Sequence, residues 1–160
     1  MKVLKFEIHM EPSYLEGLLT RRITGVVVNT LPHGAPYKLT LLAGKEGALE
    51  ITSRSEIVSE RREIGLLTFR CTSIAAKGAV EIRTSFCPTT ANKLIFRDRD
   101  VYAESGVELV DEAGTCRYIV AGAQPMTIAT NFSDSARFWE PEYQIEEYER
   151  MPLLSGHQGD

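Results

Sequence analysis

Alternation of apolar and polar residues recurs along most of this chain, and no other feature of the sequence constrains the fold as strongly. It begins at residues 4–10, Leu-Lys-Phe-Glu-Ile-His-Met, and returns in four later segments. Successive side chains of a β-strand point to opposite faces of a sheet, so this period of two predicts strands that each bury one face. The later segments are residues 69–71, 80–86, 116–120 and 126–130.

Glycine and proline turns separate the expected strands at short intervals, which is typical of an all-β barrel or sandwich. Simple up-and-down connections favour an antiparallel β-barrel, with a β-sandwich as the alternative. Residues 55–63 suit a short helix or a polar edge strand, and residues 101–110 suit a strand or a helix. The other expected strands cover residues 3–10, 23–31, 37–42, 48–53, 66–73, 79–86, 93–96, 115–121 and 126–132.

The length of 160 residues predicts one domain, which we place at residues 1–154, followed by a flexible polar tail at residues 155–160. A short helix is expected near residues 14–22 with Ser13 as its cap, although Gly17 also allows a loop. A second short helix is expected at residues 141–151. Its signals are Pro141 at the first helical position and the spacing of Glu146 and Arg150.

Residues 66–73 and 79–86 form the clearest predicted hairpin. Closing it around residues 75–78 places Phe69 opposite Thr84, and Arg70 opposite Arg83. Two facing guanidinium groups are unfavourable unless an anion lies between them, so Arg70 and Arg83 are candidate ligand-binding residues. The alternative is a solvated face on which Glu81 relieves the repulsion.

The inward face of the expected strands supplies the remaining candidates. Most of these side chains are apolar and suit a core, but the hydroxyl groups of Tyr118, Thr84 and Thr130 must find partners once buried. They could orient a ligand inside a barrel, with Tyr118 as the candidate catalytic donor, or they could bond to one another or to backbone. The candidate substrate-binding residues on this face are Phe69, Thr84, Phe86, Met126 and Thr130.

Charge and hydropathy exclude two classes of partner from our expectations. The net charge is −4 and the basic residues are scattered, whereas nucleic-acid binders usually carry a basic stripe. No stretch approaches the ~18 apolar residues of a membrane span. Glu7 and His9 interrupt the first apolar segment, which disfavours a secretory signal. We therefore expect a cytoplasmic protein without a nucleic-acid or membrane partner.

Neither a metal nor a cofactor is expected. The three histidines and three cysteines show no ligand spacing, and no phosphate-binding loop occurs. His33 lies in a loop rich in proline and glycine. It could act there as an acid or base, or it could simply be exposed.

Residues 138–148 combine the only tryptophan with two tyrosines and an acidic run. Aromatic side chains among carboxylates suit docking onto another subunit of a homo-oligomer or onto a basic partner. They equally suit packing against the protein's own barrel.

Two functions follow from these observations. The first is a barrel that binds a small apolar or amphipathic molecule, either alone or as a cofactor-independent isomerase or cyclase. Positioning alone could supply much of the catalysis. The alternative is a non-enzymatic interaction or assembly subunit that uses the acidic aromatic C-terminal segment.

Overall fold

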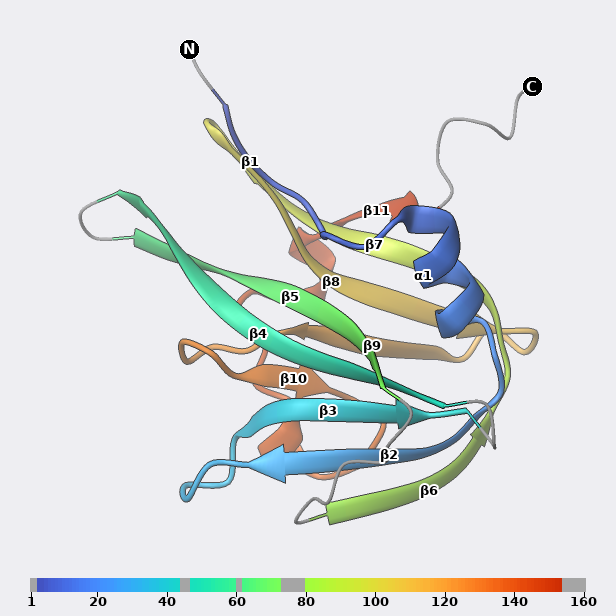
Figure 1. Ribbon diagram of the computed structural model, residues 1–160. Helices are drawn as coiled ribbons and strands as arrows, with labels where there is room; N and C mark the ends of the chain where they lie inside the picture. The colour runs from blue at the N-terminus through green and yellow to red at the C-terminus, as the bar shows by residue number, and fades with distance from the viewer. Residues whose placement is uncertain (1–2, 44–46, 60–61, 73–79, 154–160) are drawn as a thin grey trace, which may run out of the picture.

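The chain forms two β-sheets that are packed face to face and joined at one end (Figure 1). The computed structural model describes residues 3–43, 47–59, 62–72 and 80–153. The first sheet has the strand order β5-β4-β3-β2-β6. Its strands are β2 (Ile23–Thr30), β3 (Pro36–Leu42), β4 (Ala48–Ser59), β5 (Arg62–Thr72) and β6 (Val80–Phe86).

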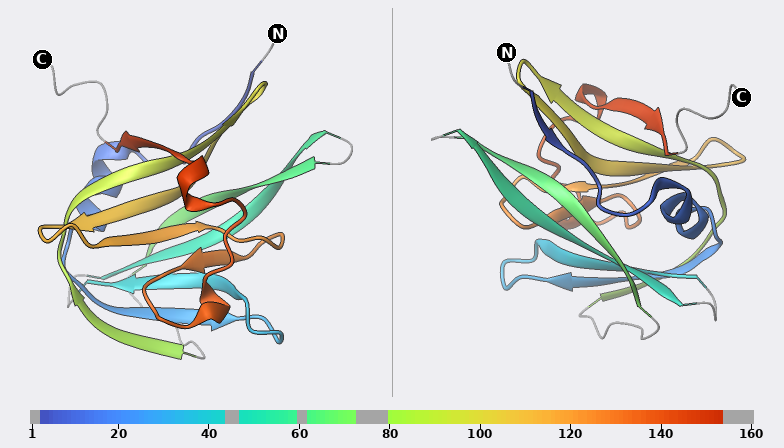
Figure 2. Two further views of the ribbon diagram at one scale, coloured as in Figure 1. Left: turned by 180° about the vertical axis from the view of Figure 1, so that it is seen from behind. Right: turned by 45° about the horizontal axis from the view of Figure 1, so that its top comes forward.

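The second sheet has the order β10-β9-β8-β7-β11, and β1 runs parallel to the first part of β8. After β6 the chain passes directly into β7 of this sheet through Cys87, at the closed end of the molecule seen in Figure 2. Its strands are β1 (Leu4–Phe6), β7 (Pro88–Asp98), β8 (Val101–Asp111), β9 (Cys116–Ala121), β10 (Ile128–Thr130) and β11 (Glu149–Pro152).

The all-β prediction is confirmed, and a sandwich-like pair of sheets fits the structure. Closure into a barrel is not confirmed, because the strands of the described residues divide into two separate hydrogen-bonded sheets. Residues 101–110 and 55–59, which the sequence left open, lie in β8 and β4.

The predicted hairpin between residues 66–73 and 79–86 is wrong. β5 pairs with β4, so Arg70 lies opposite Glu50, and β6 pairs with β2, so Arg83 lies opposite Gly25. β4 and β5 follow each other closely in the chain and pair along almost their whole length, so little chain entropy is lost on closing that hairpin. Arg70 also meets an opposite charge there, with its Nη2 3.1 Å from Glu50 Oε2.

The N-terminal helix is confirmed as α1 (Pro12–Leu19), a little earlier than expected. Its cap is the carboxylate of Glu11, which accepts the Tyr14 N–H at 3.0 Å, rather than Ser13. Leu15 and Leu19 are fully buried, and burying each such side chain contributes about 1.5–3 kcal/mol. These two leucines therefore anchor α1 on the main core between the two sheets.

The C-terminal helix is not formed. Residues 141–151 instead contain the 3₁₀ turn η2 (Ile145–Glu147) and then β11, which pairs with β7; a similar turn, η1 (Ala136–Phe138), precedes them. Helical i,i+4 pairs are worth only ~0.2–0.5 kcal/mol, less than the strand pairing and aromatic burial that replace them. The predicted tail lies outside the described residues.

The main core fills the space between the sheets. It unites residues of both sheets with α1, including Leu15, Val28, Leu67, Val107 and Ile119. A further cluster lies on the outer side of the second sheet, under the C-terminal segment that crosses it in the left view of Figure 2. β8 is therefore covered on both faces, and its residues 101–109 are all buried.

Two buried glutamates of β8 point to opposite faces of the second sheet. Asn92 and Lys93 are successive residues of β7, so their side chains point in opposite directions. Asn92 Nδ2 donates to Glu108 and Lys93 Nζ to Glu104, each at 3.0 Å. Glutamates four residues apart would share a face on a regular strand. The bulge in the β7–β8 pairing lies between them and places their side chains on opposite faces.

Glu104 holds the N-terminal segment on one face. Its carboxylate is 2% exposed and accepts the Ile8 N–H at 2.8 Å and the Tyr102 hydroxyl at 2.7 Å, in addition to the Lys93 ammonium. The carboxylate thus has three donors, which is what a buried charge requires. The same contacts fix the chain that leads from β1 to α1.

Glu108 has the corresponding role on the other face. It accepts Arg150 Nε at 3.2 Å, and Arg150 Nη1 donates to the carbonyl groups of Ile145 and Tyr148, both at 2.9 Å. The arginine therefore links β8 to η2 and β11 and holds the C-terminal segment over the second sheet.

Gly106 is required where β8 bends, because a side chain there would collide with β9. A Cβ atom would lie 2.5 Å from Val120 Cγ1 and 2.8 Å from the Ile119 carbonyl oxygen.

Gly106→Ala should lower the free energy of unfolding by about 1–3 kcal/mol, as overpacking of a core usually does. Gly17→Ala is the control: its Cβ would meet nothing within 4 Å, so α1 should gain about 0.5–1 kcal/mol. Urea denaturation of both variants measures the difference, and equal effects would contradict the close β8–β9 packing.

Candidate functional site

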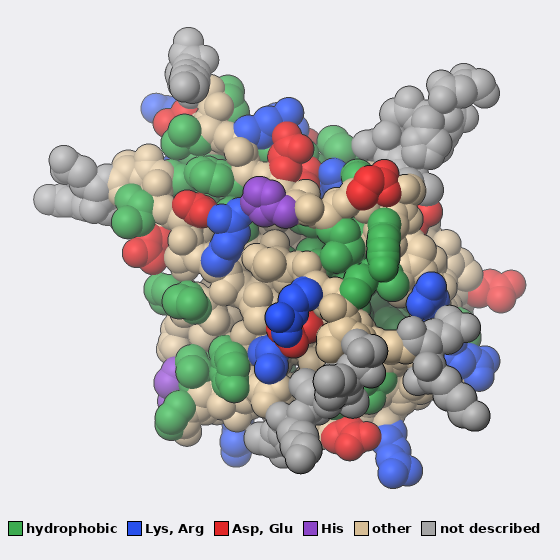
Figure 3. All heavy atoms as spheres, viewed as in Figure 1, with side chains coloured by type: hydrophobic (Ala, Val, Ile, Leu, Met, Phe, Trp, Pro, Cys, Tyr) green, Lys and Arg blue, Asp and Glu red, His purple; other side chains and the backbone are tan. Residues whose placement is uncertain are grey.

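A recess of about 220 Å³ lies between α1 and the ends of β3, β4 and β5. Hydrophobic side chains gather beside α1 on the face shown in Figure 3. Leucine and isoleucine side chains from both the helix and the sheet form the apolar wall of the recess. It is lined by Tyr14, Leu18, Arg21, Ile23, Leu41, Ala43, Gly47, Ala48, Leu49, Cys71 and Thr72.

Four polar side chains from two separate parts of the chain meet at this recess. Tyr14 and Arg21 come from α1 and the residues that follow it, and Cys71 and Thr72 come from the end of β5. The Cys71 thiol donates to the Tyr14 hydroxyl at 3.3 Å. Contact with the Cys71 side chain raises the pKa of Tyr14. A phenol is protonated at neutral pH with or without this shift, and its own proton is available to a ligand.

The helix has two apolar stripes, so one can anchor it to the core while the other lines the recess. Leu15 and Leu19 are buried in the core, whereas Tyr14 and Leu18, also four residues apart, line the recess. Tyr14, Leu18 and Arg21 also border a shallower groove along the exposed side of α1. The recess therefore opens onto the helix surface.

The site residues expected from the sequence lie in several different environments. Phe69 and Phe86 belong to the main core, whereas Met126 is 61% exposed in the turn before β10. Thr130 is buried, and its hydroxyl accepts the Phe132 N–H at 3.2 Å. These residues are not brought together with the recess.

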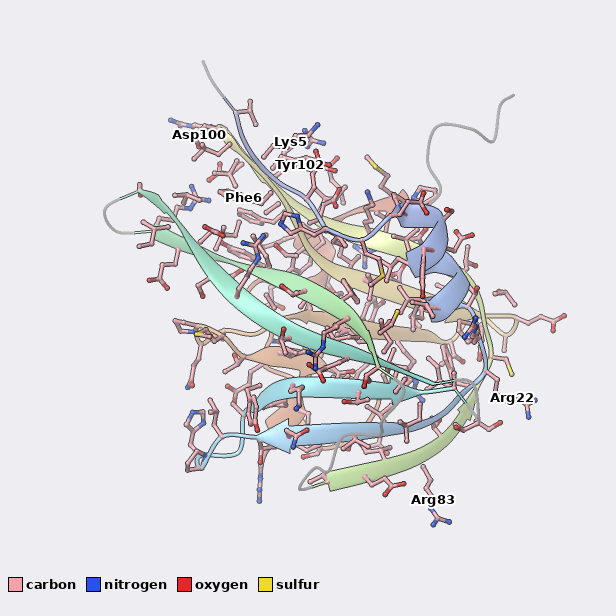
Figure 4. The ribbon with its side chains drawn as sticks, in the orientation of Figure 1. Lys5, Phe6, Arg22, Arg83, Asp100 and Tyr102 are labelled. Atoms are coloured by element: carbon pink, nitrogen blue, oxygen red, sulfur yellow. The ribbon has the colours of Figure 1, made fainter. Side chains whose placement is uncertain are left out.

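The polar candidates are equally dispersed. Tyr118 lies on β9 with its ring centroid 5.9 Å from that of Trp139, and burial raises its pKa. Thr84 is half-buried on β6, next to the exposed Arg83 that Figure 4 labels. Arg70 is exposed and paired with Glu50, so the predicted Arg70–Arg83 subsite is not formed. That any one of these candidate residues binds a ligand stays a prediction.

His33 borders a second, polar hollow of about 240 Å³. The loop between β2 and β3 contributes His33, Gly34 and Ala35, and Gln124, Arg137 and Glu140 complete the lining. His33 itself is exposed. This hollow lacks the apolar wall of the recess beside α1.

The aromatic residues of the C-terminal segment face the protein's own second sheet. Tyr148 is buried, Trp139 packs beside Tyr118, and Tyr143 stacks on Phe96 with ring centroids 3.9 Å apart. These contacts correspond to the packing alternative for residues 138–148 rather than to a surface that displays its aromatic rings.

Glu142 of the same segment joins the two sheets. Its carboxylate oxygens accept the Gly65 N–H of β5 at 3.1 and 3.2 Å. Burial raises the pKa of Glu142 above the ordinary glutamate value of 4.5, although the Gly65 hydrogen bond and Arg62 oppose the shift. The ionised carboxyl group is thus less well solvated here than in water.

Comparisons with protein-family models, with curated proteins and with solved structures found no match to this chain. The one described α-helix, α1, has eight residues, well short of the length that a bilayer crossing requires. Among the described residues, no three His, Cys, Asp or Glu side chains are grouped so that they could hold a metal ion.

Glu142 should make stability depend on pH. The raised pKa means that the folded state binds a proton more tightly than the unfolded state does. The contribution of protonated Glu142 to the free energy of unfolding is complete below pH 4.5. It is lost as the pH rises through the folded-state pKa. Glu142→Gln cannot ionise and still accepts the Gly65 N–H, so it should flatten this part of the profile. Glu146→Gln, exposed in the same segment, is the control. Denaturation between pH 4 and pH 7 measures the change, and parallel profiles for Glu142→Gln and wild type would contradict it.

Proposed function

We propose that this protein binds a small amphipathic molecule in the recess beside α1. The observation that carries the proposal is the convergence of an apolar wall with a few polar groups, which is the usual composition of small-molecule sites. Leu18, Leu41 and Leu49 would contact the apolar part of the ligand. The Tyr14 hydroxyl would donate to its polar end.

The volume restricts the ligand. Sites for drug-sized molecules measure roughly 300–1,000 Å³, and this recess, at about 220 Å³, is smaller. The expected ligand is therefore a small molecule with one polar group. The proposal moves the site from the barrel interior expected from the sequence, where large side chains now form the core, to the α1 end of the sandwich.

A cofactor-independent activity at this recess would rest on orientation of the substrate and on proton transfer. The Tyr14 hydroxyl and the Cys71 thiol, 3.3 Å apart, are both groups that can donate or accept a proton at a bound molecule. A cofactor-independent isomerase or cyclase needs a step of this kind together with orientation of its substrate. The raised pKa of Tyr14 makes the phenol a hydrogen-bond donor rather than a base at neutral pH, so binding of a ligand is the primary proposal for this recess.

Filling the recess should abolish binding. Ala48 lines it at the start of β4, so Ala48→Phe should exclude the ligand, whereas Ala113→Phe in the exposed β8–β9 turn should not. A ligand at a hundred times its Kd adds about 2.7 kcal/mol, or roughly 5–10 °C in Tm for a domain of this size. Thermal shifts with hexanoate, hexanol, hexylamine and propylphenol provide the measurement.

At least one probe should raise the Tm of wild type and of Ala113→Phe but not that of Ala48→Phe. If no probe shifts wild type, or if Ala48→Phe responds as wild type does, the recess is not the site.

The Tyr14 hydroxyl should contribute to affinity for the best probe. Tyr14→Phe keeps the ring but removes one hydrogen bond, worth about 1 kcal/mol, so Kd should rise about fivefold. Tyr37→Phe, another exposed tyrosine that lies on β3, is the matched control and should leave Kd unchanged. Calorimetric titration measures both values, and an unchanged Kd for Tyr14→Phe would remove the hydroxyl from the site.

A further inference from the structure

β6 ends the first sheet with an edge that no other described strand covers. It pairs with β2 alone, and in both views of Figure 2 it is the outermost strand of the first sheet. The backbone N–H and C=O groups on such an edge can hydrogen-bond to a strand from another molecule.

The other edge strands of the described residues are short or covered. β1 and β10 have three residues each and β11 has four, against seven in β6. β5 is longer, but it packs against β8 and β9, and its Gly65 N–H is occupied by Glu142. β6 is therefore the longest of these strands with an uncovered edge.

The exposed face of β6 carries two opposite charges on either side of one residue. Glu81 and Arg83 are both exposed, they flank Ile82, and neither forms an ion pair with the described residues. An antiparallel copy of the strand, related by a two-fold axis through Ile82, would place each Glu81 opposite an Arg83 of the other copy. Opposite charges in such cross-strand positions attract, so the strand is complementary to itself.

The other face of β6 adds apolar contacts to the same pairing. Ile82 is half-buried beside the core, and Val80 is 36% exposed. Val80, Ile82 and Thr84 alternate with the charged residues and so share a face. In the symmetric register Val80 lies opposite Thr84 and Ile82 opposite Ile82, which are β-branched pairs that suit a sheet.

We propose that two copies of this chain associate through antiparallel pairing of β6 with β6, centred on Ile82. The first sheets of the two subunits then form one continuous sheet. The arrangement is an isologous dimer, because each subunit uses the same surface and the assembly closes at two. The self-complementary charges select a second copy over an unrelated strand. The pairing is centred on Ile82, which does not line the recess beside α1, so the proposal does not rest on ligand binding.

Charge reversal tests the register. Arg83→Glu alone, or Glu81→Arg alone, places like charges opposite each other at both positions and should weaken the dimer at least tenfold. The double variant Glu81→Arg/Arg83→Glu restores both pairs and should recover the wild-type Kd. Arg99→Glu, in the exposed turn between β7 and β8, is the control with the same change of charge. Sedimentation equilibrium over a concentration series measures the Kd, and circular dichroism checks that each variant is folded.

Amide exchange of the unmodified protein provides a second test that needs no variant. Exchange in residues 80–86 should slow as the concentration rises, whereas exchange in β10 should not change. A wild-type protein that stays monomeric at several hundred micromolar would overturn the proposal. A double variant that fails to recover, or an Arg99→Glu variant as weak as Arg83→Glu, would overturn it as well.

Discussion

The rest of the structure depends on the burial of two carboxylates in β8, one on each face of the second sheet. Glu104 is 2% exposed and accepts three hydrogen bonds, one of them from Lys93, itself largely buried. Replacing such a pair by apolar residues is often neutral, but removing one partner costs about 3–5 kcal/mol. That cost is a large fraction of the 5–15 kcal/mol by which domains are usually stable. Satisfying Glu104 and Glu108 therefore requires both ends of the chain to be in place.

This constraint connects the fold with the proposed site. Ile8 donates to Glu104 and so holds the N-terminal segment against β8, and the segment continues directly into α1. α1 then forms one wall of the recess, opposite the end of β5 that carries Cys71. On the other face, Arg150 joins Glu108 to the C-terminal segment, whose aromatic rings pack on the second sheet. The segment that the sequence marked for partner binding thus has a structural role, and the uncovered edge lies elsewhere, at β6.

The sequence predicts strands where one face is buried, and much less where tertiary contacts decide. Period-two alternation identifies β6, which buries mainly one side. It fails for β8, which is buried on both sides and therefore lacks a polar face. The prediction that β5 pairs with β6 was wrong, because alternation does not indicate which strand pairs with which. The recess was missed because Tyr14 and Cys71, 57 residues apart, meet only after α1 packs on the sheets. The paired stripes Tyr14/Leu18 and Leu15/Leu19 were the one local signal for it.

Native-state amide exchange in two variants tests the central claim most directly. Glu104→Leu should speed exchange in residues 4–19 and leave β2, β3 and β4 close to wild type. The acceptor is lost to Ile8 of the N-terminal segment and to Lys93 and Tyr102 of the second sheet, but to no strand of the first sheet. Glu108→Leu should speed exchange in residues 139–152 instead. Uniform loss of protection in both variants, or full protection of both ends of the chain, would contradict the view that these carboxylates hold the two ends on opposite faces of β8.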